Sequence, residues 1–365
     1  MQTVKNITNI KYFLDLFATV DHEYSFDVKY HKKAPKTHFH SLPTFVAEFR
    51  NCSVNTLPCL MTKDRHLITD NVWPLLHKYK HKPQKTHGLW NEWTELDIDI
   101  KMTPITKQLE GVGRFVWLPV DKESANNPWH IWIDVISKFR LIEKRGILNF
   151  SKFIYVLSNP SAYFDKVAKE MFPDIKYYVM PEGETWRFQH LIVPSMSNSQ
   201  DGIVTPHLPV WLRHFKGLFG FKNIKPHRKI FVSRENAPTR KLLNSAELLM
   251  AIKGWEIIKM EELSIKEQFK TFAEATHILA THGAGLVNIL WCNPGTKVIE
   301  IQDKNRIDKK VYPILSHHLN LKHEIYLSDV IKINVGDGNK PAGVKRVNDL
   351  INFKINVPEL IRHLD

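Results

Sequence analysis

The hydrophobic pattern of the chain becomes regular at about residue 112, where short apolar runs begin to alternate with amphipathic segments. Val112–Val120 is apolar, β-branched and aromatic, which predicts a buried strand, and further strands are predicted at Lys152–Leu157 and Lys176–Met180. Between them, Trp129–Lys144 carries apolar residues at helical spacing, and Asn159 followed by a proline predicts the capped start of another helix. Strands that alternate with helices indicate a parallel sheet with helices on its faces.

The second half of the chain repeats this alternation more clearly. Two capping boxes, Asn244 with Glu247 and Ser264 with Glu267, predict two helix starts, and a third helix is predicted at Leu286–Cys292. Four strands are predicted around these helices: Lys229–Ser233, Trp255–Met260, His277–Thr281 and Lys297–Gln302. This half therefore indicates a doubly wound α/β domain.

The length and the change of pattern near residues 201–225 indicate two domains, because 365 residues exceed one typical domain and fit two. We predict an N-terminal domain over 1–205, of which 1–105 is basic and weakly patterned. A C-terminal Rossmann-like domain is predicted over 206–345, followed by a tail over 346–365 with a short closing helix. In such α/β domains, ligands bind at the carboxyl ends of the parallel strands.

The formal net charge of +13 suggests an anionic partner, which could be a phosphorylated substrate, a membrane surface or a nucleic acid. Much of the local charge density lies in two runs, Lys29–Lys33 and Lys78–Lys85, which could equally form a solvated basic face. The chain has neither regularly spaced Cys/His fingers nor an aromatic-rich RNA-binding signature, so we expect no nucleic-acid partner.

The cysteine pattern and the lack of long apolar runs favour a cytoplasmic protein. Three cysteines, Cys52, Cys59 and Cys292, form no disulfide framework, which suits a reducing compartment. The N-terminal segment lacks the apolar stretch of a signal peptide, and no run approaches the roughly 20 apolar residues that span a bilayer. Peripheral contact of the basic N-terminal third with a membrane surface is a further hypothesis.

The sharpest local feature is the segment from His282 through Gly283, Ala284 and Gly285 to Asn288, which lies where a predicted strand ends and a helix begins. Glycines allow close approach of the backbone to a ligand, and a helix N-terminus offers N–H donors and a positive dipole end. A diphosphate suits such a place, and His282 could donate to a phosphate oxygen or to a sugar. The alternative is a tight turn that needs glycine only for its backbone angles.

A second feature follows another predicted strand, where Ser233 and Arg234 are followed by Arg240. Arginine suits phosphate because its planar group donates two parallel hydrogen bonds and stays charged. Since these residues and His282 follow parallel strands, all are expected at one edge of the sheet, although solvated surface arginines are the simpler alternative. Glu300, inside an apolar strand, lies either on an outward face or where it could accept hydrogen bonds from ribose hydroxyls.

A third feature is the pair His130 and Asp134, which share one face if the helix has begun by His130. A carboxylate beside an imidazole can orient it and raise its basicity, which suits a general base. The alternative is a helix start with Asn127 as its cap, a partly buried histidine and a salt-bridging aspartate. No metal motif stands out: Asp97 and Asp99 form an Asp-x-Asp, but in the weakly patterned third, and we interpret it as chance.

Three segments, in this order along the chain, together resemble glycosyltransferase family 61. They are Asn127 with His130 and Asp134; Ser233, Arg234, Arg240, Asn244 and Glu247; and His282–Asn288 with Pro294–Thr296 and Glu300. The resemblance covers roughly residues 110 to 305. The chain departs from the family at Pro128, where relatives often have an aromatic residue.

The resemblance implies a GT-B-type fold, with two Rossmann-like domains facing a central cleft, and an inverting transferase that uses a UDP-sugar and no catalytic metal or other cofactor. Xylose and N-acetylglucosamine rank first as the transferred sugar, and the acceptor would be a glycan or glycolipid. Either His130 or Asp134 would act as the base on the acceptor side. The implied donor-binding residues are Ser233, Arg234, Arg240, His282, Gly283, Ala284, Gly285, Asn288 and Glu300.

Two other classes of function remain open from the sequence. A non-catalytic nucleotide- or sugar-binding module would keep the glycine turn and the arginines without catalysis. A charge-driven nucleic-acid-binding protein would show a steep salt dependence spread over many basic residues. A dinucleotide oxidoreductase is disfavoured because no Gly-x-Gly-x-x-Gly follows the first strand of either half.

Overall fold

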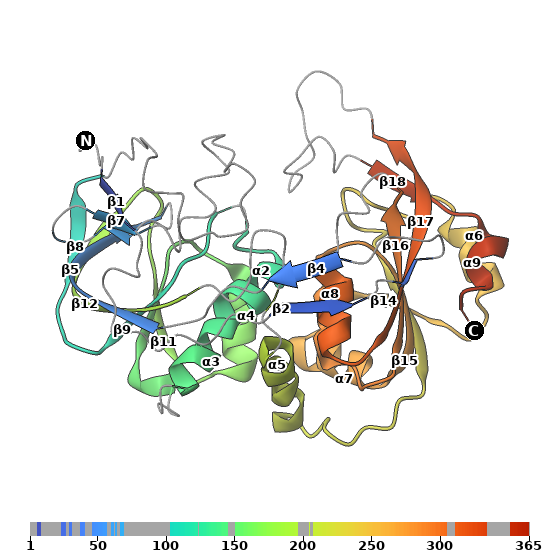
Figure 1. Ribbon diagram of the computed structural model, residues 1–365, viewed down its shortest axis with the longest axis horizontal. Helices are drawn as coiled ribbons and strands as arrows, with labels where there is room; N and C mark the ends of the chain where they lie inside the picture. The colour runs from blue at the N-terminus through green and yellow to red at the C-terminus, as the bar shows by residue number, and fades with distance from the viewer. Residues whose placement is uncertain are drawn as a thin grey trace. The chain divides into compact units, whose positions relative to one another are not determined.

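The computed structural model describes residues 6–8, 23–26, 29–30, 37–40, 46–56, 60–61, 63, 66–68, 103–122, 124–144, 150–195, 204, 207–304, 311–333 and 351–364. The chain divides into two compact units, an N-terminal unit of residues 1–21 and 42–200 and a C-terminal unit of residues 22–41 and 201–365 (Figure 1). Segment 22–41 belongs to the second unit, in which β3 (Lys29–Tyr30) pairs with β17 (Lys322–Lys332). Both units are mixed α/β, which confirms the predicted class.

The N-terminal unit is built on one mixed sheet, which has nine strands within the described residues. Their order is β1 (Asn6–Thr8), β7 (His66–Ile68), β6 (Leu60–Met61), β5 (Val46–Asn55), β12 (Thr185–Pro194), β9 (Phe115–Leu118), β10 (Ile154–Leu157) and β11 (Lys176–Val179), with β8 (Ile105–Leu109) also paired to β12. The β9, β10 and β11 strands are parallel, whereas β5 runs antiparallel to β12. All four residues of β9 are buried, as its apolar sequence predicts.

The helix predicted at Trp129–Lys144 is present but is not uniform. It consists of α2 (Pro128–His130), the π-helix η3 (Ile131–Ile136) and α3 (Ser137–Lys144). Asn127 caps its start, because its side chain accepts a hydrogen bond from the Trp129 N–H at 3.0 Å. Five of the six η3 residues are buried, which holds this helix firmly in the unit. A π-helical turn is rare and is frequently found at functional sites.

Asn159 does not cap the next helix, so that prediction is wrong. Its side chain instead donates to the carbonyl oxygens of Thr56 and Val120, both at 2.8 Å, and ties the loop after β10 to the loop after β9. The cap of α4 (Ala162–Met171) is Ser161, which accepts from the Phe164 N–H at 2.9 Å. A 3₁₀ turn, η4 (Phe150–Lys152), precedes β10.

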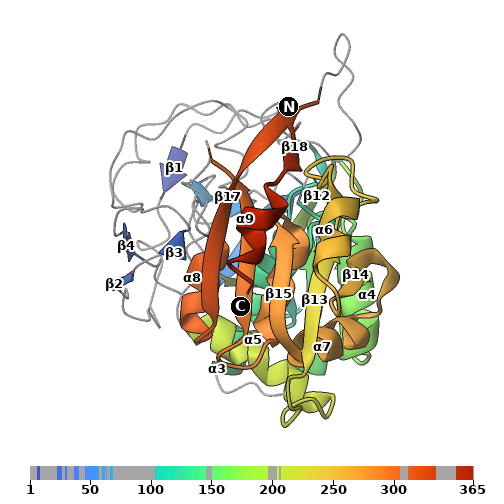
Figure 2. The same ribbon diagram turned by 90° about the vertical axis from the view of Figure 1, so that its right-hand side faces the viewer.

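The C-terminal unit contains a parallel sheet in the order β14 (Glu256–Lys259), β13 (Arg228–Ser233), β15 (Ala275–Thr281), β16 (Lys297–Asp303) and β17, closed by the antiparallel β18 (Ile351–Lys354) (Figure 2). In chain order the five parallel strands follow 2-1-3-4-5, a doubly wound topology whose direction reverses between β13 and β15. A separate ribbon pairs β2 (Glu23–Phe26) with β4 (Thr37–His40).

Helices cover both faces of this sheet. On one side lie α6 (Ser245–Ala251) and α9 (Val357–Ile361); on the other lie α7 (Ile265–Ala273) and α8 (Val311–His318) (Figure 1). Further helical segments are α5 (His207–Leu218), η5 (Met260–Glu262) and the 3₁₀-helix η6 (Ala284–Trp291). Side chains on the α6/α9 side, such as Phe231 and Leu279, form one continuous core with α9 residues, as a sheet buried on both faces requires.

Two of the helix starts predicted in this unit have different outcomes. Ser264 and Glu267 form the predicted capping box of α7, with both reciprocal hydrogen bonds present. Asn244 occupies the N-cap position of α6, but its side chain makes no capping hydrogen bond, because its amide group pairs with the backbone of Ile355 at 2.9 and 3.2 Å. The third predicted helix, Leu286–Cys292, is the 3₁₀-helix η6, which begins two residues earlier.

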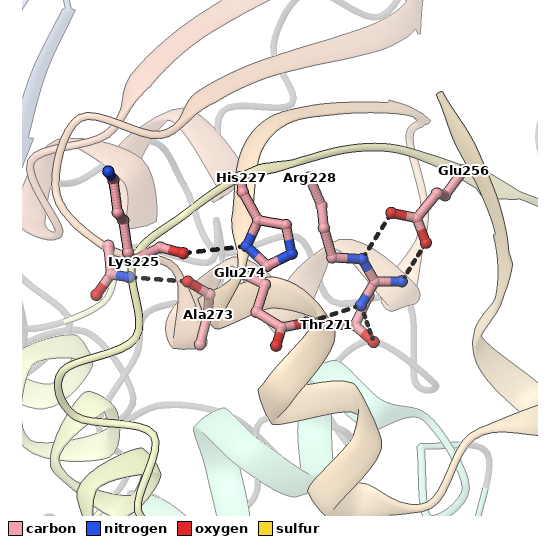
Figure 3. A network of polar contacts seen from close by, with 8 residues as sticks. Lys225, His227, Arg228, Glu256, Thr271, Ala273 and Glu274 are labelled. Carbon is pink, nitrogen blue, oxygen red and sulfur yellow. Dashed lines mark hydrogen bonds and ion pairs between the residues drawn. The ribbon is translucent and has the colours of Figure 1, made fainter. Parts of the chain in front are cut away.

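An ion-pair network fixes the amino end of β13 (Figure 3). Arg228 donates to both carboxylate oxygens of Glu256 at 2.8 and 2.6 Å and to Glu274 at 3.0 Å. These bonds raise the pKa of Arg228 and lower the pKa of Glu256, so both stay charged. The network joins β13 to β14 and to the end of α7, and so holds the amino end of the sheet that positions the loops at its other end.

Candidate active site

The loops after β13 and β15 bring the strongest chemical groups of the C-terminal unit together. Ser233 ends β13 and Arg234 follows it, while Thr281 ends β15 and His282 follows it. The two strands are hydrogen-bonded neighbours, so the loops emerge at the same carboxyl edge. This edge is also where the sheet reverses direction, the usual ligand position in an open α/β sheet. Sequence order and spacing therefore correctly placed these loops side by side.

The guanidinium group of Arg234 packs directly on the backbone of Gly283. A Cβ atom added at Gly283 would lie 3.0 Å from Arg234 Cζ, so a larger residue here would require the guanidinium group to move. Arg234 Nη2 donates to the Thr239 carbonyl at 3.3 Å, while its Nε is buried and has no hydrogen-bond partner among the described residues. Burial, together with the nearby Arg240 charge, lowers the pKa of Arg234 to about 10. The guanidinium group is thus a cation at neutral pH, held in a place that would gain from an anion.

Arg240 ties the two loops to each other. Its Nη1 donates to the His282 carbonyl at 3.2 Å, and its own carbonyl accepts from Thr281 Oγ1 at 3.1 Å. Its backbone has a φ of 59°, in the left-handed region, and its N–H donates to Ile351 of β18 at 2.6 Å. Such a conformation is uncommon for a residue other than glycine, and it persists here because bonds on both sides fix the backbone.

The carboxylate of Glu300 is fully buried and lies between two histidines. Its Oε1 is hydrogen-bonded to His282 Nδ1 and its Oε2 to His323 Nε2, the latter at 3.0 Å. Burial raises the pKa of Glu300, but the two histidines outweigh burial and bring this pKa to about 2. Both oxygens are therefore occupied by protein, and the predicted contact of Glu300 with a ribose stays a prediction.

The other predicted donor-side residues are close to this edge but differ in what they contact. Gly285 has room for a Cβ atom, which would lie 3.4 Å from Met260 Cγ in ordinary contact. Ala284 is the first residue of η6, where N–H groups lack intrahelical acceptors. Asn288 is buried and bonds within η6, donating to the Gly285 carbonyl and accepting from Trp291 Nε1. Ser233 Oγ accepts from the Glu235 N–H at 3.2 Å, which shapes the loop after β13.

Two residues of the site were missed by the sequence argument. Tyr312 of α8 donates its hydroxyl hydrogen to the Gly283 carbonyl at 2.7 Å, and its ring lies edge-on to His282 with the centroids 5.4 Å apart. His323 of β17 holds the far side of Glu300. Neither belongs to a recognisable motif, and only the packing of α8 and the register of β17 bring them to the loop.

His130 and Asp134 form a hydrogen-bonded pair in the N-terminal unit, as their spacing predicts. His130 Nδ1 and Asp134 Oδ2 are 2.6 Å apart. The exposed side-chain fractions are 34% for His130 and 15% for Asp134, so the imidazole is the more accessible of the two. Since Nδ1 faces the carboxylate, the Nε2 atom lies on the other side of the ring, as in a general base oriented by an acid.

Lys138 lies one helical turn beyond Asp134 and is buried. Its Nζ donates to the carbonyl oxygens of Pro194 and Ser195 at 3.2 and 2.8 Å, at the end of β12. Burial lowers the pKa of Lys138 to about 7, although the Asp134 charge opposes this. A neutral amine still has two N–H groups for these two carbonyls, so the site is fully bonded without a charge.

A cavity of about 700 Å³ lies at the opposite, amino edge of the C-terminal sheet, with His277, Lys297 and Lys322 among its lining residues. Ligands of parallel α/β sheets bind at the carboxyl edge instead, so this cavity is not at the predicted donor site. Within the described ranges, no group of three or more His, Cys, Asp or Glu side chains could hold a metal ion. Asp97 and Asp99 lie outside those ranges. None of the helices in the described part is long and apolar enough to span a bilayer.

Comparison with known proteins identifies the family of the chain. A family model described as Glycosyltransferase 61 matches residues 66–299. Because that match covers more than half of the chain, the protein belongs to glycosyltransferase family 61. The chain is also 28% identical over 127 residues to a beta-1,2-xylosyltransferase of Oryza sativa subsp. japonica, an alignment that covers 32% of this chain and 21% of the rice protein. The chain thus aligns with about a fifth of that relative's length.

Proposed function

We propose that this protein is an inverting glycosyltransferase that transfers a sugar from a UDP-sugar to a hydroxyl group of a glycan or glycolipid acceptor, without a catalytic metal. The observation that carries the proposal is the cluster at the carboxyl edge of the C-terminal sheet. There, Arg234 packs on Gly283, Arg240 bonds to the loop, and His282 is held by Glu300. Membership of glycosyltransferase family 61 supports the same class of reaction.

The cluster suits the leaving group of sugar transfer. As the bond between the sugar and the nucleotide breaks, negative charge develops on the diphosphate, and preorganised donors stabilise it. Arg234 and Arg240 would supply charge-assisted hydrogen bonds, and the start of η6 would supply backbone N–H groups. In this proposal, these groups do what a bound metal ion does in metal-dependent sugar transferases.

On the acceptor side, we assign the general base to His130 and the orienting role to Asp134. The 2.6 Å hydrogen bond leaves Nε2 of His130 available to take the proton of an acceptor hydroxyl. One base that activates one hydroxyl on the face opposite the leaving group is what a single-displacement, inverting reaction needs. A GT-B arrangement, with the two units facing a central cleft, would bring this base to the donor sugar.

For the transferred sugar, xylose ranks before N-acetylglucosamine. The aligned rice relative carries the name of a beta-1,2-xylosyltransferase, and that name is the reason for the order. We also propose a cytoplasmic location and peripheral contact with anionic membranes. Co-sedimentation with anionic vesicles at low salt tests the membrane contact, and a protein that stays in the supernatant would rule it out.

A thermal-shift screen against UDP, GDP, CMP and their sugar conjugates, with EDTA present, tests the central proposal. A ligand that binds only the native state raises the melting temperature by mass action. We expect a UDP-selective increase that survives EDTA, is lost in Arg234→Ala and persists in Arg362→Ala, which removes an exposed arginine of the same unit. An increase that requires a metal, or the absence of any nucleotide effect, would contradict the proposal.

A further inference from the structure

Glu300 is a carboxylate buried inside the C-terminal unit. Glu300 lies on β16, and its neighbours in the register are Ala280 of β15 and Ile325 of β17. Its side chain is completely inaccessible to solvent. An isolated buried carboxylate is costly, so such a group needs hydrogen bonds and an opposite charge to remain ionised. His282 and His323 supply the hydrogen bonds, and either imidazole is able to carry the positive charge.

His323 can be satisfied as a neutral imidazole. Its Nε2 is 3.0 Å from Glu300 Oε2, and its Nδ1 is 2.7 Å from Ser316 Oγ. With one hydrogen on Nε2, the ring donates to the carboxylate and accepts the hydroxyl hydrogen of Ser316. All three polar groups then have partners and His323 carries no charge. In that state, His282 is the one of the two histidines left to carry a positive charge that balances Glu300.

His282 is placed to carry that charge. Its Nδ1 is hydrogen-bonded to Glu300 Oε1, while its Nε2 makes no hydrogen bond to any described residue. About 20% of the His282 side chain is exposed, so the ring connects a buried anion with the surface of the site. A ring with hydrogens on both nitrogens would donate to Glu300 on one side and to a ligand on the other.

The other groups around His282 act on its charge in known directions. Arg240 donates to the His282 carbonyl, and Arg234 packs on the next residue, so both guanidinium charges disfavour a third cation. Tyr312 faces the ring but is neutral, because burial and the nearby Glu300 raise its pKa. Glu300 is the carboxylate that contacts the His282 ring, and its negative charge favours the protonated ring.

We propose that Glu300, held by His323 and Ser316, is a positioning residue that keeps His282 as an imidazolium and directs its Nε2–H to a phosphate oxygen of the bound nucleotide. The proposal rests on the proposed function, since it takes the ligand of this edge to be UDP. It also assigns roles to Ser316 and His323, which lie beyond the residues 66–299 that the family model matches. In place of ribose binding, it gives Glu300 an electrostatic role through His282.

The test is the dissociation constant of UDP measured by calorimetry between pH 5.5 and 9, for the wild type and Glu300→Gln. Removing an opposite charge in direct contact moves a titration by about one pH unit or more. We expect the pH at which UDP binding is half lost to fall by about that amount in Glu300→Gln. Binding at pH 5.5 should stay within about threefold of the wild type, since low pH keeps the imidazole protonated without help from the carboxylate.

Two further measurements separate this role from the alternatives. In a His282→Gln background, Glu300→Gln should change UDP binding little, because the carboxylate acts through His282. With 2′-deoxy-UDP, the pH shift should persist, whereas a ribose contact would make Glu300→Gln harmless for this ligand. Ser316→Ala removes only a hydroxyl and should shift the profile in the same direction by a smaller amount, which keeps the test valid if Glu300→Gln fails to fold.

The outcomes separate a failure of the proposed function from a failure of the positioning role of Glu300. If the wild type binds no UDP at any pH, the proposed function itself fails. If the wild type binds UDP but Glu300→Gln weakens binding equally at every pH, or does so in the His282→Gln background, the positioning role is overturned and direct ligand contact replaces it. If Glu300→Gln does not fold and Ser316→Ala leaves the profile unchanged, the role is overturned as well.

Discussion

Each unit contains a histidine whose Nδ1 is hydrogen-bonded to a carboxylate, and the two pairs are built differently. His130 and Asp134 are four residues apart on one helix, and both are partly exposed. His282 and Glu300 are 18 residues apart, His282 in the loop after β15 and Glu300 on the neighbouring strand β16, and Glu300 is fully buried. An accessible pair can exchange a proton with an incoming hydroxyl, whereas a buried carboxylate fixed from both sides holds a constant charge. The same two side-chain types are thus suited to proton transfer in one unit and to fixed electrostatics in the other.

Among the variants that test the difference between the two pairs, we expect the largest effect, a loss of kcat, from Asp134→Asn. The substitution keeps the shape of the side chain but removes the charge that, in the proposed function, orients and activates His130. We expect kcat to fall by about a hundredfold to ten-thousandfold, the usual contribution of a general base, while the affinity for UDP stays unchanged. The measurement is UDP release from the sugar nucleotide that the thermal-shift screen selects.

Asp165→Asn is the matched control for that variant. Asp165 lies in α4 of the same unit and is exposed, and within the described residues its side chain accepts a hydrogen bond only from the Tyr177 hydroxyl, at 2.8 Å. Its replacement should leave kcat within about twofold. If Asp134→Asn had the same small effect as Asp165→Asn, the pair in the N-terminal unit would not be the base. The two histidine–carboxylate pairs would then not differ in proton transfer.

The next largest effect is on the free energy of unfolding. It tests whether Lys138, one helical turn beyond Asp134, is charged in the folded state. The pKa of Lys138 is lowered to about 7 in the folded state from an ordinary value of 10.5. Between these pH values the unfolded chain binds one more proton than the folded chain, so the free energy of unfolding should rise with pH. The greatest slope from one such group is about 1.4 kcal/mol per pH unit. Lys138→Met keeps an apolar stem of similar length and removes the titration.

Urea denaturation at several pH values between 7 and 10 measures this slope. Other groups titrate in that range, so the quantity to compare is the wild-type slope minus the slope of Lys138→Met. A difference close to zero would mean that Lys138 keeps its charge when buried, and that Asp134 has a permanent cation one turn away. In that case the N-terminal pair would resemble the fixed charges of the C-terminal unit more closely.

Features that follow from local spacing or from the topology of a parallel sheet were predictable from the sequence, and individual hydrogen bonds between distant residues were not. The His130–Asp134 bond follows from a four-residue separation on a helix, and the meeting of Arg234 with Gly283 follows from loops at one edge of a parallel sheet. Asn159 and Asn244 looked like helix caps, but tertiary hydrogen bonds to distant backbone groups took their side chains. No local pattern could distinguish these two uses of asparagine.

The partners of Glu300 were unpredictable for a related reason. A carboxylate in an apolar strand can face solvent, a ligand or a buried partner, and all three leave the same sequence pattern. In the structure, Glu300 faces a buried partner. The pairing of β16 with β17 brings His323 to Glu300, and the packing of α8 brings Ser316 to His323. The π-helical turn at Ile131–Ile136 was also missed, because its apolar spacing matches an ordinary helix.

The smallest of the expected effects comes from a pair of glycine variants that tests whether the donor site depends on close packing. A Cβ atom at Gly283 would force Arg234 away, whereas one at Gly285 would meet only Met260 at an ordinary distance. Gly283 is extended, with a φ of 173°, and Gly285 is helical, so alanine brings no backbone strain at either position. Any difference between the two variants therefore reports on the position of the guanidinium group.

We expect Gly283→Ala to weaken UDP binding by about tenfold or more, which corresponds to the loss of one charge-assisted hydrogen bond. Gly285→Ala should bind UDP within about twofold of the wild type. Adding Arg234→Ala to Gly283→Ala should weaken binding little further, because the arginine has already left its place. Equal losses in both glycine variants would mean that the whole turn, rather than the arginine, holds the nucleotide. The fixed charge of the C-terminal unit would then come from His282 and the start of η6.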